Sequence, residues 1–357
     1  MSEKIKLGEL GKVVSGSTPK TNIKDYWDGE ILWITPAEIQ EDDYYIADTQ
    51  RKITNLAVEK TNLKLLPKGT VLLSSRAPIG KVAICDNDMY CNQGFKNIIC
   101  SDRLENRYVY YFLKYNVEYI KSLGRGATFK EISKGIVENL EIPYIEKKEQ
   151  IEIANKLDKI TEILKIKKQQ IKQFDEIIKS QFVEMFENKN YEKLSGKELF
   201  SFSSGKFLEA SKRLENGVPV YGGNGVAWYT DEPLIDFNTI VIGRVGAYCG
   251  NVKLIKEPVW ITDNAIFIKQ FKKDVYNIDF LYYMMELVDF SRFAQFSGQP
   301  KITQKPLEEF NYVVPPIEEQ IKFSNIVKQI DKQKFEIENS LKEMQELYEA
   351  LMERYFG

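Results

Sequence analysis

The stretch PYIEKKEQIEIANKLDKITEILKIKKQQIKQFDEIIKSQFVEMFE (143–187) decides the architecture of this chain. After Pro143 it contains neither Pro nor Gly. From Ile153 onward its apolar residues recur at alternating spacings of four and three, with Lys167 and Gln181 as polar interruptions. This heptad spacing is typical of a long helix that packs along a second helix. The stretch therefore predicts one long helix and requires a helical partner.

The partner is expected at the other end of the chain. VVPPIEEQ (313–320) leads into a second apolar seam, formed by Phe323, Val327, Ile330, Ile337, Leu341, Met344, Tyr348, Leu351 and Tyr355. A similar entrance, IPYIEKKEQ (142–150), opens the first helix. Aligning Tyr108 with Phe280 and Pro143 with Pro315 gives an offset of 172 residues in both cases. Repeated spacing of this kind indicates an internal duplication.

Each half also carries short β-rich runs bounded by Gly, Pro or Asn, followed by a helical run. These are strands at 70–75, 81–86 and 94–100 with a helix at 106–123, and strands at 238–244, 250–256 and 264–270 with a helix at 277–290. The predicted fold class is α+β, with two similar mixed α/β domains separated by an antiparallel pair of long coiled-coil helices in a pseudo-twofold repeat. The predicted boundaries are 1–145 and 188–317 for the domains, and 146–187 and 318–357 for the helices.

Composition excludes several function classes. The chain has 357 residues and 43% hydrophobic content, enough for sizeable cores, but it has no histidine. Catalysis or metal binding that depends on His is therefore excluded. The four cysteines form no Cys-x-x-Cys pair, and neither a Walker loop nor a G-x-G-x-x-G fingerprint occurs. We expect no catalytic residue and no metal site, hence no enzyme, and without a leader or apolar span we expect a cytoplasmic protein.

Several segments in this order resemble one known family. They are SGSTPKT (15–21), DGEILWITPAEI (28–39), RAPIGKVAI (76–84), YGGNG (221–225), IGRVGAYCGNV (242–252), ITDNAIFI (261–268), SGQPKIT (297–303) and VPPIEEQ (314–320). Together with the two long helices they resemble the specificity (S) subunit of type I restriction–modification systems. The resemblance covers essentially the whole chain.

The resemblance implies a function without chemistry. Each globular domain would be a target recognition domain that reads one half of a bipartite sequence in double-stranded DNA. The helices would set the spacing and bind two methyltransferase (M) subunits, and restriction (R) subunits would complete the complex. S-adenosylmethionine, ATP and Mg are then expected on the partner subunits only, and no cofactor on this chain.

Direct readout of DNA needs Arg, Lys, Asn or Gln at base edges, with hydroxyls on phosphates. Candidates are loop residues flanked by Gly or Pro. In the first half they are Ser17, Thr18, Lys20, Thr35, Arg76, Lys81, Arg125, Thr128 and Lys130. In the second half they are Tyr221, Asn224, Arg244, Tyr248, Asn264, Gln299 and Lys301. The pair Arg76 and Arg244 is predicted to occupy matching positions after a strand.

Charge is a complication for this interpretation. The chain has 50 basic and 52 acidic residues, a net charge of −2, whereas a protein that neutralises many phosphates usually has a basic excess. Positive charge is then expected on one face or on the partner subunits. Two alternatives stay open: the specificity subunit of a system whose partner fuses nuclease and methyltransferase, and a coiled-coil protein-interaction scaffold without a DNA role.

Overall fold

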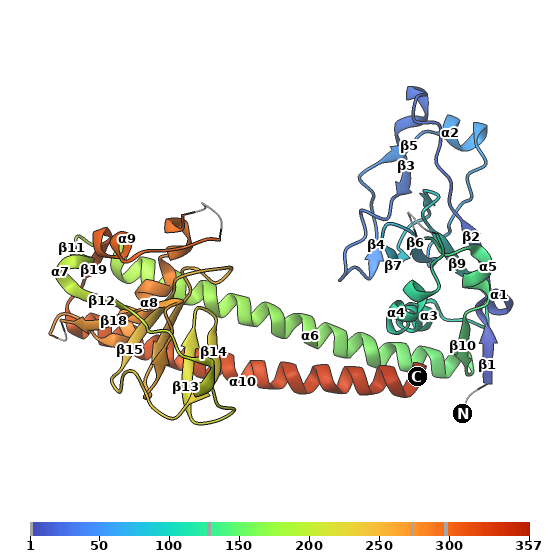
Figure 1. Cartoon of the computed structure of the whole chain (residues 1–357). Helices are drawn as coiled ribbons and strands as arrows, with labels where there is room; N and C mark the ends of the chain where they lie inside the picture. Colours follow the sequence, from blue (N-terminus) through green and yellow to red (C-terminus); the bar gives the residue numbers. More distant parts are fainter. Residues whose placement is uncertain (1–2, 127–129, 273, 296–298) are drawn as a thin grey trace. The chain divides into compact units, whose positions relative to one another are not determined.

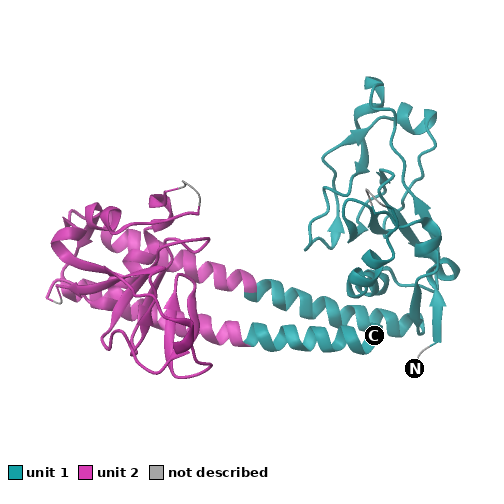
Figure 2. Cartoon of the chain, viewed as in Figure 1, with its two compact units in different colours: residues 1–167, 340–357 teal, residues 168–339 magenta. Residues whose placement is uncertain are grey.

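The computed structural model describes residues 3–126, 130–272, 274–295 and 299–357. The chain divides into two compact units, unit 1 (residues 1–167 and 340–357) and unit 2 (residues 168–339), coloured separately in Figure 2. Two long helices, α6 (Lys147–Phe182) and α10 (Ile317–Phe356), each contribute residues to both units. The predicted pair of long helices is thus confirmed. No helix in the described ranges is long and apolar enough to cross a membrane.

Unit 1 is built on a five-stranded sheet in the order β2-β9-β6-β7-β4 (Figure 1). Its strands are β2 (Gly11–Ser15), β9 (Lys96–Cys100), β6 (Val71–Ser75), β7 (Ile79–Cys85) and β4 (Tyr45–Ile46). A smaller sheet joins β5 (Lys52–Ile53), β3 (Trp27–Ile34) and β8 (Tyr90–Cys91), and β1 (Glu3–Lys6) pairs with β10 (Glu141–Tyr144). The helices are α1 (Leu7–Leu10), α2 (Asn55–Lys60), α3 (Asn106–Tyr115), α4 (Val117–Ser122) and α5 (Lys134–Glu138).

The single helix expected over 106–123 is two helices. α3 ends at Tyr115 and α4 begins at Val117. Between them, the Asn116 side-chain amide donates to the Phe112 carbonyl at 2.9 Å. Asn116 itself leaves the helical conformation, with φ −90° and ψ 14°, and Asn side chains favour such local bonds, so the predicted helix is interrupted at this residue.

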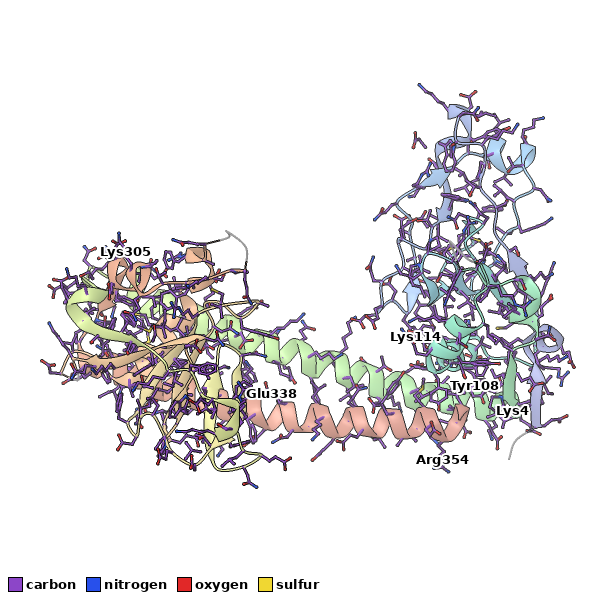
Figure 3. All side chains as sticks on the ribbon, viewed as in Figure 1. Lys4, Tyr108, Lys114, Lys305, Glu338 and Arg354 are labelled. Carbon is purple, nitrogen blue, oxygen red and sulfur yellow. The ribbon has the colours of Figure 1, made fainter. Side chains whose placement is uncertain are left out.

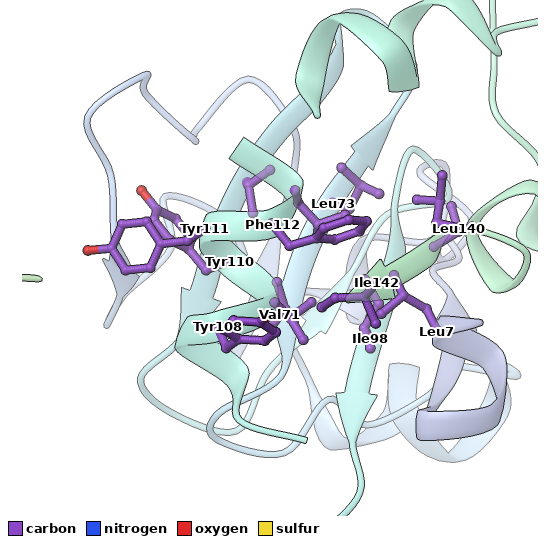
Figure 4. Packing of buried hydrophobic residues seen from close by; sticks show 14 of the residues in the cluster. Leu7, Val71, Leu73, Ile98, Tyr108, Tyr110, Tyr111, Phe112, Leu140 and Ile142 are labelled. Carbon is purple, nitrogen blue, oxygen red and sulfur yellow. The ribbon is translucent and has the colours of Figure 1, made fainter. Parts of the chain in front are cut away.

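The core of unit 1 joins the sheet to both long helices. Val71, Leu73 and Ile98 on the sheet pack with Tyr108 and Phe112 on α3, as Figure 4 shows. The same cluster takes Ile153 and Leu157 from the beginning of α6, and Tyr348, Met352 and Phe356 from the end of α10. The Tyr108 ring, also labelled in Figure 3, lies 5.0 Å from the Phe356 ring. Because the start of one helix packs beside the end of the other, the two run antiparallel here.

Unit 2 repeats this plan. Its main sheet has the order β12-β18-β15-β16, with β12 (Phe200–Ser204), β18 (Ala265–Phe271), β15 (Thr239–Gly243) and β16 (Val252–Ile255). A smaller sheet joins β14 (Gly225–Thr230), β13 (Val218–Gly222) and β17 (Trp260–Ile261), and β11 (Glu192–Ser195) pairs with β19 (Asn311–Val314). The helices are α7 (Gly196–Leu199), α8 (Ile278–Leu287) and α9 (Gln304–Glu309), and α6 is prolonged by a π-helical turn at Val183–Glu187.

The core of unit 2 is held in the corresponding way. Phe182 and Phe186, from the end of α6, pack with Phe280 on α8 and with Phe323 and Val327 near the start of α10. The rings of Phe186 and Phe280 lie 5.0 Å apart, the same separation as Phe356 and Tyr108 in unit 1. Each mixed α/β domain is therefore held by the helix that follows it and by the end of the other long helix. This confirms the predicted fold class of two similar domains with antiparallel helices.

A buried glutamine joins each long helix to its domain. Gln150 accepts from the Glu105 amide at 2.8 Å and donates to the carbonyls of Arg103 at 3.0 Å and Ile145 at 2.8 Å. Its side chain is fully buried, so these bonds satisfy a polar group that would otherwise be costly to bury. The amide thus ties the start of α6 to the start of α3.

Gln320 makes the same three contacts in unit 2. It accepts from the Asn277 amide at 2.9 Å and donates to the carbonyls of Val275 and Pro315, both at 2.8 Å. Ile145 therefore corresponds to Pro315, and the predicted match of Pro143 with Pro315 is wrong by two residues. In this register IEKKEQ (145–150) corresponds to PPIEEQ (315–320). The hydrogen bonds of the Gln fix this register, whereas the proline does not.

An ion pair also joins each long helix to its domain, and the positive and negative residues are exchanged between the two units. In unit 1, Arg107 on α3 contacts Asp158 on α6 at 2.8 Å. In unit 2 the corresponding residues have exchanged charge, and Asp279 on α8 contacts Lys328 on α10 at 2.6 Å. Both pairs sit at the second residue of the short helix and eight residues after the buried Gln. The two halves therefore share a geometry but differ in charge at this contact.

Candidate nucleic-acid interface

A short hairpin closes on the end of β6 in unit 1. The backbones of Arg125 and Glu131 exchange two hydrogen bonds of 3.0 Å, and the amide of Ile132 donates to the carbonyl of Ser75, also at 3.0 Å. Arg125 and Lys130 are exposed on this hairpin, and Arg76 directly follows Ser75. Three predicted residues thus come together, while the predicted Thr128 lies outside the described residues.

A second loop holds the predicted residues Ser17, Thr18 and Lys20. Gly16 approaches the backbone so closely that a Cβ atom there would lie 1.9 Å from the Asn92 carbonyl oxygen. The Ser17 amide donates to the Cys91 carbonyl at 3.0 Å, and the Thr18 hydroxyl bonds the side chain of Gln93. The glycine therefore lets this loop lie directly against residues 91–93, with Thr18 and Lys20 exposed.

Thr35 and Lys81 are engaged within the domain. The Thr35 hydroxyl donates to Glu38 at 2.9 Å, while the Lys81 amine donates to the carbonyls of Pro36 at 3.0 Å and Ile39 at 2.5 Å. Lys81 thus holds the loop after β3 in place. A role for its amine in DNA contact stays a prediction.

The electrostatics of the hairpin involve two residues that the sequence did not single out, Lys96 and Glu131. The Lys96 amine, on a side chain that is 9% exposed, contacts Glu131 at 3.0 Å and the Ser75 hydroxyl at 3.2 Å. Arg76 lies on the other side of the same carboxylate, at 3.8 Å. An isolated Lys within a strand and an isolated Glu in a loop carry no sequence signal, because only the fold brings them together.

In unit 2 the predicted residues also gather around one strand end. The Arg244 amide donates to the Asn264 carbonyl at 2.9 Å, and its guanidinium donates to the Asp263 carbonyl at 3.3 Å. The Tyr221 carbonyl accepts from the Thr262 amide at 2.9 Å, which places β13 beside the same loop. Among the described residues the buried Nε of Arg244 has no hydrogen-bond partner.

A backbone pairing with the same residue spacing as in unit 1 lies at this strand end. Gln295 and Lys301 exchange backbone hydrogen bonds of 2.9 and 3.2 Å, and the Ile302 amide donates to the Arg244 carbonyl at 2.9 Å. Gln299 approaches the chain at Gly246, where an added Cβ would lie 3.3 Å from its side-chain amide. Four other predicted residues here are exposed: Asn224, Tyr248, Asn264 and Lys301.

The predicted match of Arg76 with Arg244 is wrong by one residue. The carbonyl of Ser75 accepts from Ile132, whereas the carbonyl of Arg244 accepts from Ile302. Arg244 therefore occupies the place of Ser75, and Val245 that of Arg76. By the same register, Lys301 occupies the place of Glu131. The two domains present different side chains from one backbone framework.

The side chains gathered at the ends of β6 and β15 form two clusters, and both are suited to binding. Guanidinium, ammonium, amide and hydroxyl groups are the donors that proteins use on bases and phosphates. Among the described residues no group of acidic, His or Cys side chains is placed to hold a metal ion. The thiols are unsuited as nucleophiles, because burial raises the pKa of Cys91 and Cys100 to about 12.

The match to a known protein family occurs twice, once in each half of the chain. A family model described as the type I restriction modification DNA specificity domain matches residues 2–174 and again residues 188–347. A 186-residue stretch is 42% identical to the type I restriction enzyme MjaIX specificity subunit of Methanocaldococcus jannaschii and covers 51% of this chain but only 42% of that relative. The EcoprrI specificity subunit of Escherichia coli is 26% identical over 92% of this chain and 87% of its own length.

A solved structure has the same fold. The type I restriction–modification S subunit from M. genitalium superimposes with a TM-score of 0.67, covering 100% of this chain and 96% of that one at 22% identity.

Proposed function

Because the chain belongs to the family of type I restriction modification DNA specificity domains, we propose that it selects the DNA sequence on which a restriction–modification complex acts. Each mixed α/β domain reads one half of a bipartite target in double-stranded DNA. The chain itself performs no chemistry and binds no cofactor. S-adenosylmethionine, ATP and Mg belong to the partner subunits, and the complex works in the cytoplasm.

One observation carries this proposal: a cluster of charged and polar side chains is built twice on one framework but with different residues. In unit 1 the cluster contains Arg76, Arg125 and Glu131, and in unit 2 Arg244 and Lys301. A shared framework suits one task, docking against a DNA groove, while different side chains suit different base sequences. The near-neutral chain supports the view that partner subunits supply further phosphate contacts.

The long helices are the proposed binding surface for two methyltransferase subunits, which restriction subunits then join. Large apolar side chains are exposed on helices whose other exposed positions are rich in Lys and Glu. They include Ile163 and Ile166 in unit 1, 38% and 48% exposed, and Phe335 in unit 2, 62% exposed. Single exposed apolar residues are common on protein surfaces, so the proposed surface rests on the family, and these residues are the contacts that we expect on it. We expect Phe335→Glu to weaken methyltransferase binding without changing the unfolding free energy of unit 2.

The test is co-expression of the chain with the methyltransferase subunit of its own system, followed by sequencing of methylated DNA. We expect methylation at one bipartite motif, and none when either partner is omitted. A methyltransferase that modifies the same motif without the chain would refute the proposal. No site-specific methylation with both partners present would favour a scaffold without a DNA role.

Spacing provides a second test. α6 has 36 residues, about 54 Å at a rise of ~1.5 Å per residue. Inserting four residues into the middle of α6 should lengthen the preferred spacer between the half-sites. Unchanged methylation of the original motif would contradict a spacing role for the helices.

A further inference from the structure

Glu131 divides its two carboxylate oxygens between two environments. Oε1 contacts the Lys96 amine at 3.0 Å, whereas Oε2 faces the Arg76 guanidinium at 3.8 Å. Lys96 is nearly buried, and a buried ammonium group requires a charged or polar partner. The contact with Lys96 therefore holds the carboxylate in a fixed position at the base of the hairpin.

The contact with Arg76 is of a different kind. A distance of 3.8 Å allows attraction between charges but exceeds the length of an N–H···O hydrogen bond. Both the guanidinium and Oε2 thus keep hydrogen-bonding capacity. Their side chains are 35% and 39% exposed, so a donor and an acceptor lie next to each other at the surface.

A donor beside an acceptor matches one base pair in particular. In the major groove guanine presents two acceptors, N7 and O6, and its partner cytosine presents the N4 amino donor. Arginine is the common partner of guanine, and a carboxylate can accept from cytosine N4. An arginine and a carboxylate at adjacent positions can therefore contact both bases of one G·C pair.

We propose that Arg76 and Glu131 together read one G·C pair in the half-site recognised by unit 1, with Lys96 as the positioning residue for the carboxylate. This rests on the proposed function of the chain. Arg76 donates to guanine, and Oε2 of Glu131 accepts from cytosine.

Unit 2 provides an internal contrast. At the equivalent backbone positions Val245 replaces Arg76 and Lys301 replaces Glu131. The strand register places Ile266, which is fully buried, where unit 1 has Lys96. The donor–acceptor pair is thus not repeated at these three positions. We therefore do not expect unit 2 to read a G·C pair through these three positions.

A structural role for Glu131 makes a different prediction. If the carboxylate only neutralises Lys96, its replacement should lower stability and weaken DNA binding equally for all sequences. Base preference at a single position is the readout that separates the two roles.

The experiment uses the full chain with the methyltransferase subunit of its own system, and a library of duplexes carrying every single-base change in both half-sites. The variants are Arg76→Lys and Glu131→Gln. Glu138→Gln serves as a matched control, because Glu138 pairs with Lys134 at 3.3 Å in the same unit and both side chains are partly exposed. Lys301→Gln changes the equivalent position of unit 2, so the half-site whose base preference it alters is the one that unit 2 reads.

For the unaltered chain we expect about tenfold to hundredfold discrimination against changes at one G·C pair, in line with a bidentate base contact. Arg76→Lys and Glu131→Gln should each remove most of this discrimination at that same base pair and leave the other half-site unchanged. Glu138→Gln should change nothing. Arg76→Lys retains the positive charge at a partly exposed site, so we expect it to fold. It therefore still tests the inference if Glu131→Gln does not fold.

Two results would overturn the inference: a uniform loss of methylation with base preferences intact, or a loss of discrimination at an A·T pair. Absence of any bipartite motif with the unaltered chain would instead refute the proposed function, so the two failures are distinguishable.

Discussion

Replacing either buried glutamine should loosen one unit and leave the other intact. Gln150→Leu keeps the approximate volume but removes three hydrogen bonds, to Glu105, Arg103 and Ile145. A hydrogen bond contributes about 0.5–1.5 kcal/mol net, and an unsatisfied buried partner costs about 1–3 kcal/mol. We therefore expect a loss of about 3 kcal/mol in the free energy of unfolding of unit 1.

Hydrogen exchange followed by mass spectrometry measures this effect unit by unit. In Gln150→Leu the peptide that contains the Glu105 amide should exchange roughly a hundredfold faster, since each 1.4 kcal/mol corresponds to about a factor of ten. The peptide that contains the Asn277 amide, which bonds Gln320, should be unaffected. Gln320→Leu should give the reciprocal result.

Gln345→Leu is the control, because that amide bonds only Glu349 along the surface of α10 among the described residues. We expect it to change stability by no more than about 0.5 kcal/mol. If Gln150→Leu behaves like this control, the buried glutamine does not hold α6 to its domain and our reasoning about the entrance motif is wrong.

Phe356→Ala should lower the unfolding free energy of unit 1 by about 3–5 kcal/mol, because this buried ring packs on Tyr108. Urea unfolding measures the loss. Leu347→Ala is the control and should have little effect, because Leu347 is exposed. Iodoacetamide should label Cys91 only after unfolding, since burial raises its pKa to about 12, and rapid labelling of the native chain would contradict this. Burial opposes the charged form of Asp279, but its two lysine partners, Lys256 and Lys328, outweigh this and lower its pKa below the usual value of an aspartate. Its stabilising effect is therefore complete above about pH 5 and is lost as the pH falls through the lowered pKa. Asp279→Asn should make the stability of unit 2 less dependent on acid, as measured by fluorescence-monitored unfolding at a series of pH values.

Periodicity was sufficient to predict the long helices, because a heptad seam is a local pattern that needs no knowledge of the fold. The predicted strands at 70–75 and 238–244 appear as β6 (Val71–Ser75) and β15 (Thr239–Gly243) for the same reason. Short apolar runs between Gly, Pro and Asn leave few other options.

Register between the halves was harder to predict, because it depends on contacts between distant segments. Pro143 and Pro315 look equivalent in the sequence, yet the hydrogen bonds of Gln150 and Gln320 show that they are not. A proline only restricts the local backbone, whereas a buried amide must meet its partners at fixed distances.

The candidate site shows the same limit. The sequence pattern correctly placed Arg76 at the end of a strand. It did not indicate Glu131, which lies beside Arg76 in the structure. Its importance arises from Lys96, which lies in a strand and would ordinarily count as a surface residue. The hydrogen bond from the Ile132 amide to the Ser75 carbonyl brings the carboxylate to that strand end.

The exchanged charges at the joints limit how the two halves can recombine. A domain carrying Arg107 fits a helix with Asp158, and a domain carrying Asp279 fits a helix with Lys328. A gene segment that moved the first domain alone onto the second helix would place Arg107 against Lys328, cation against cation. The transferable cassette is therefore a domain together with at least the first dozen residues of the helix that follows it.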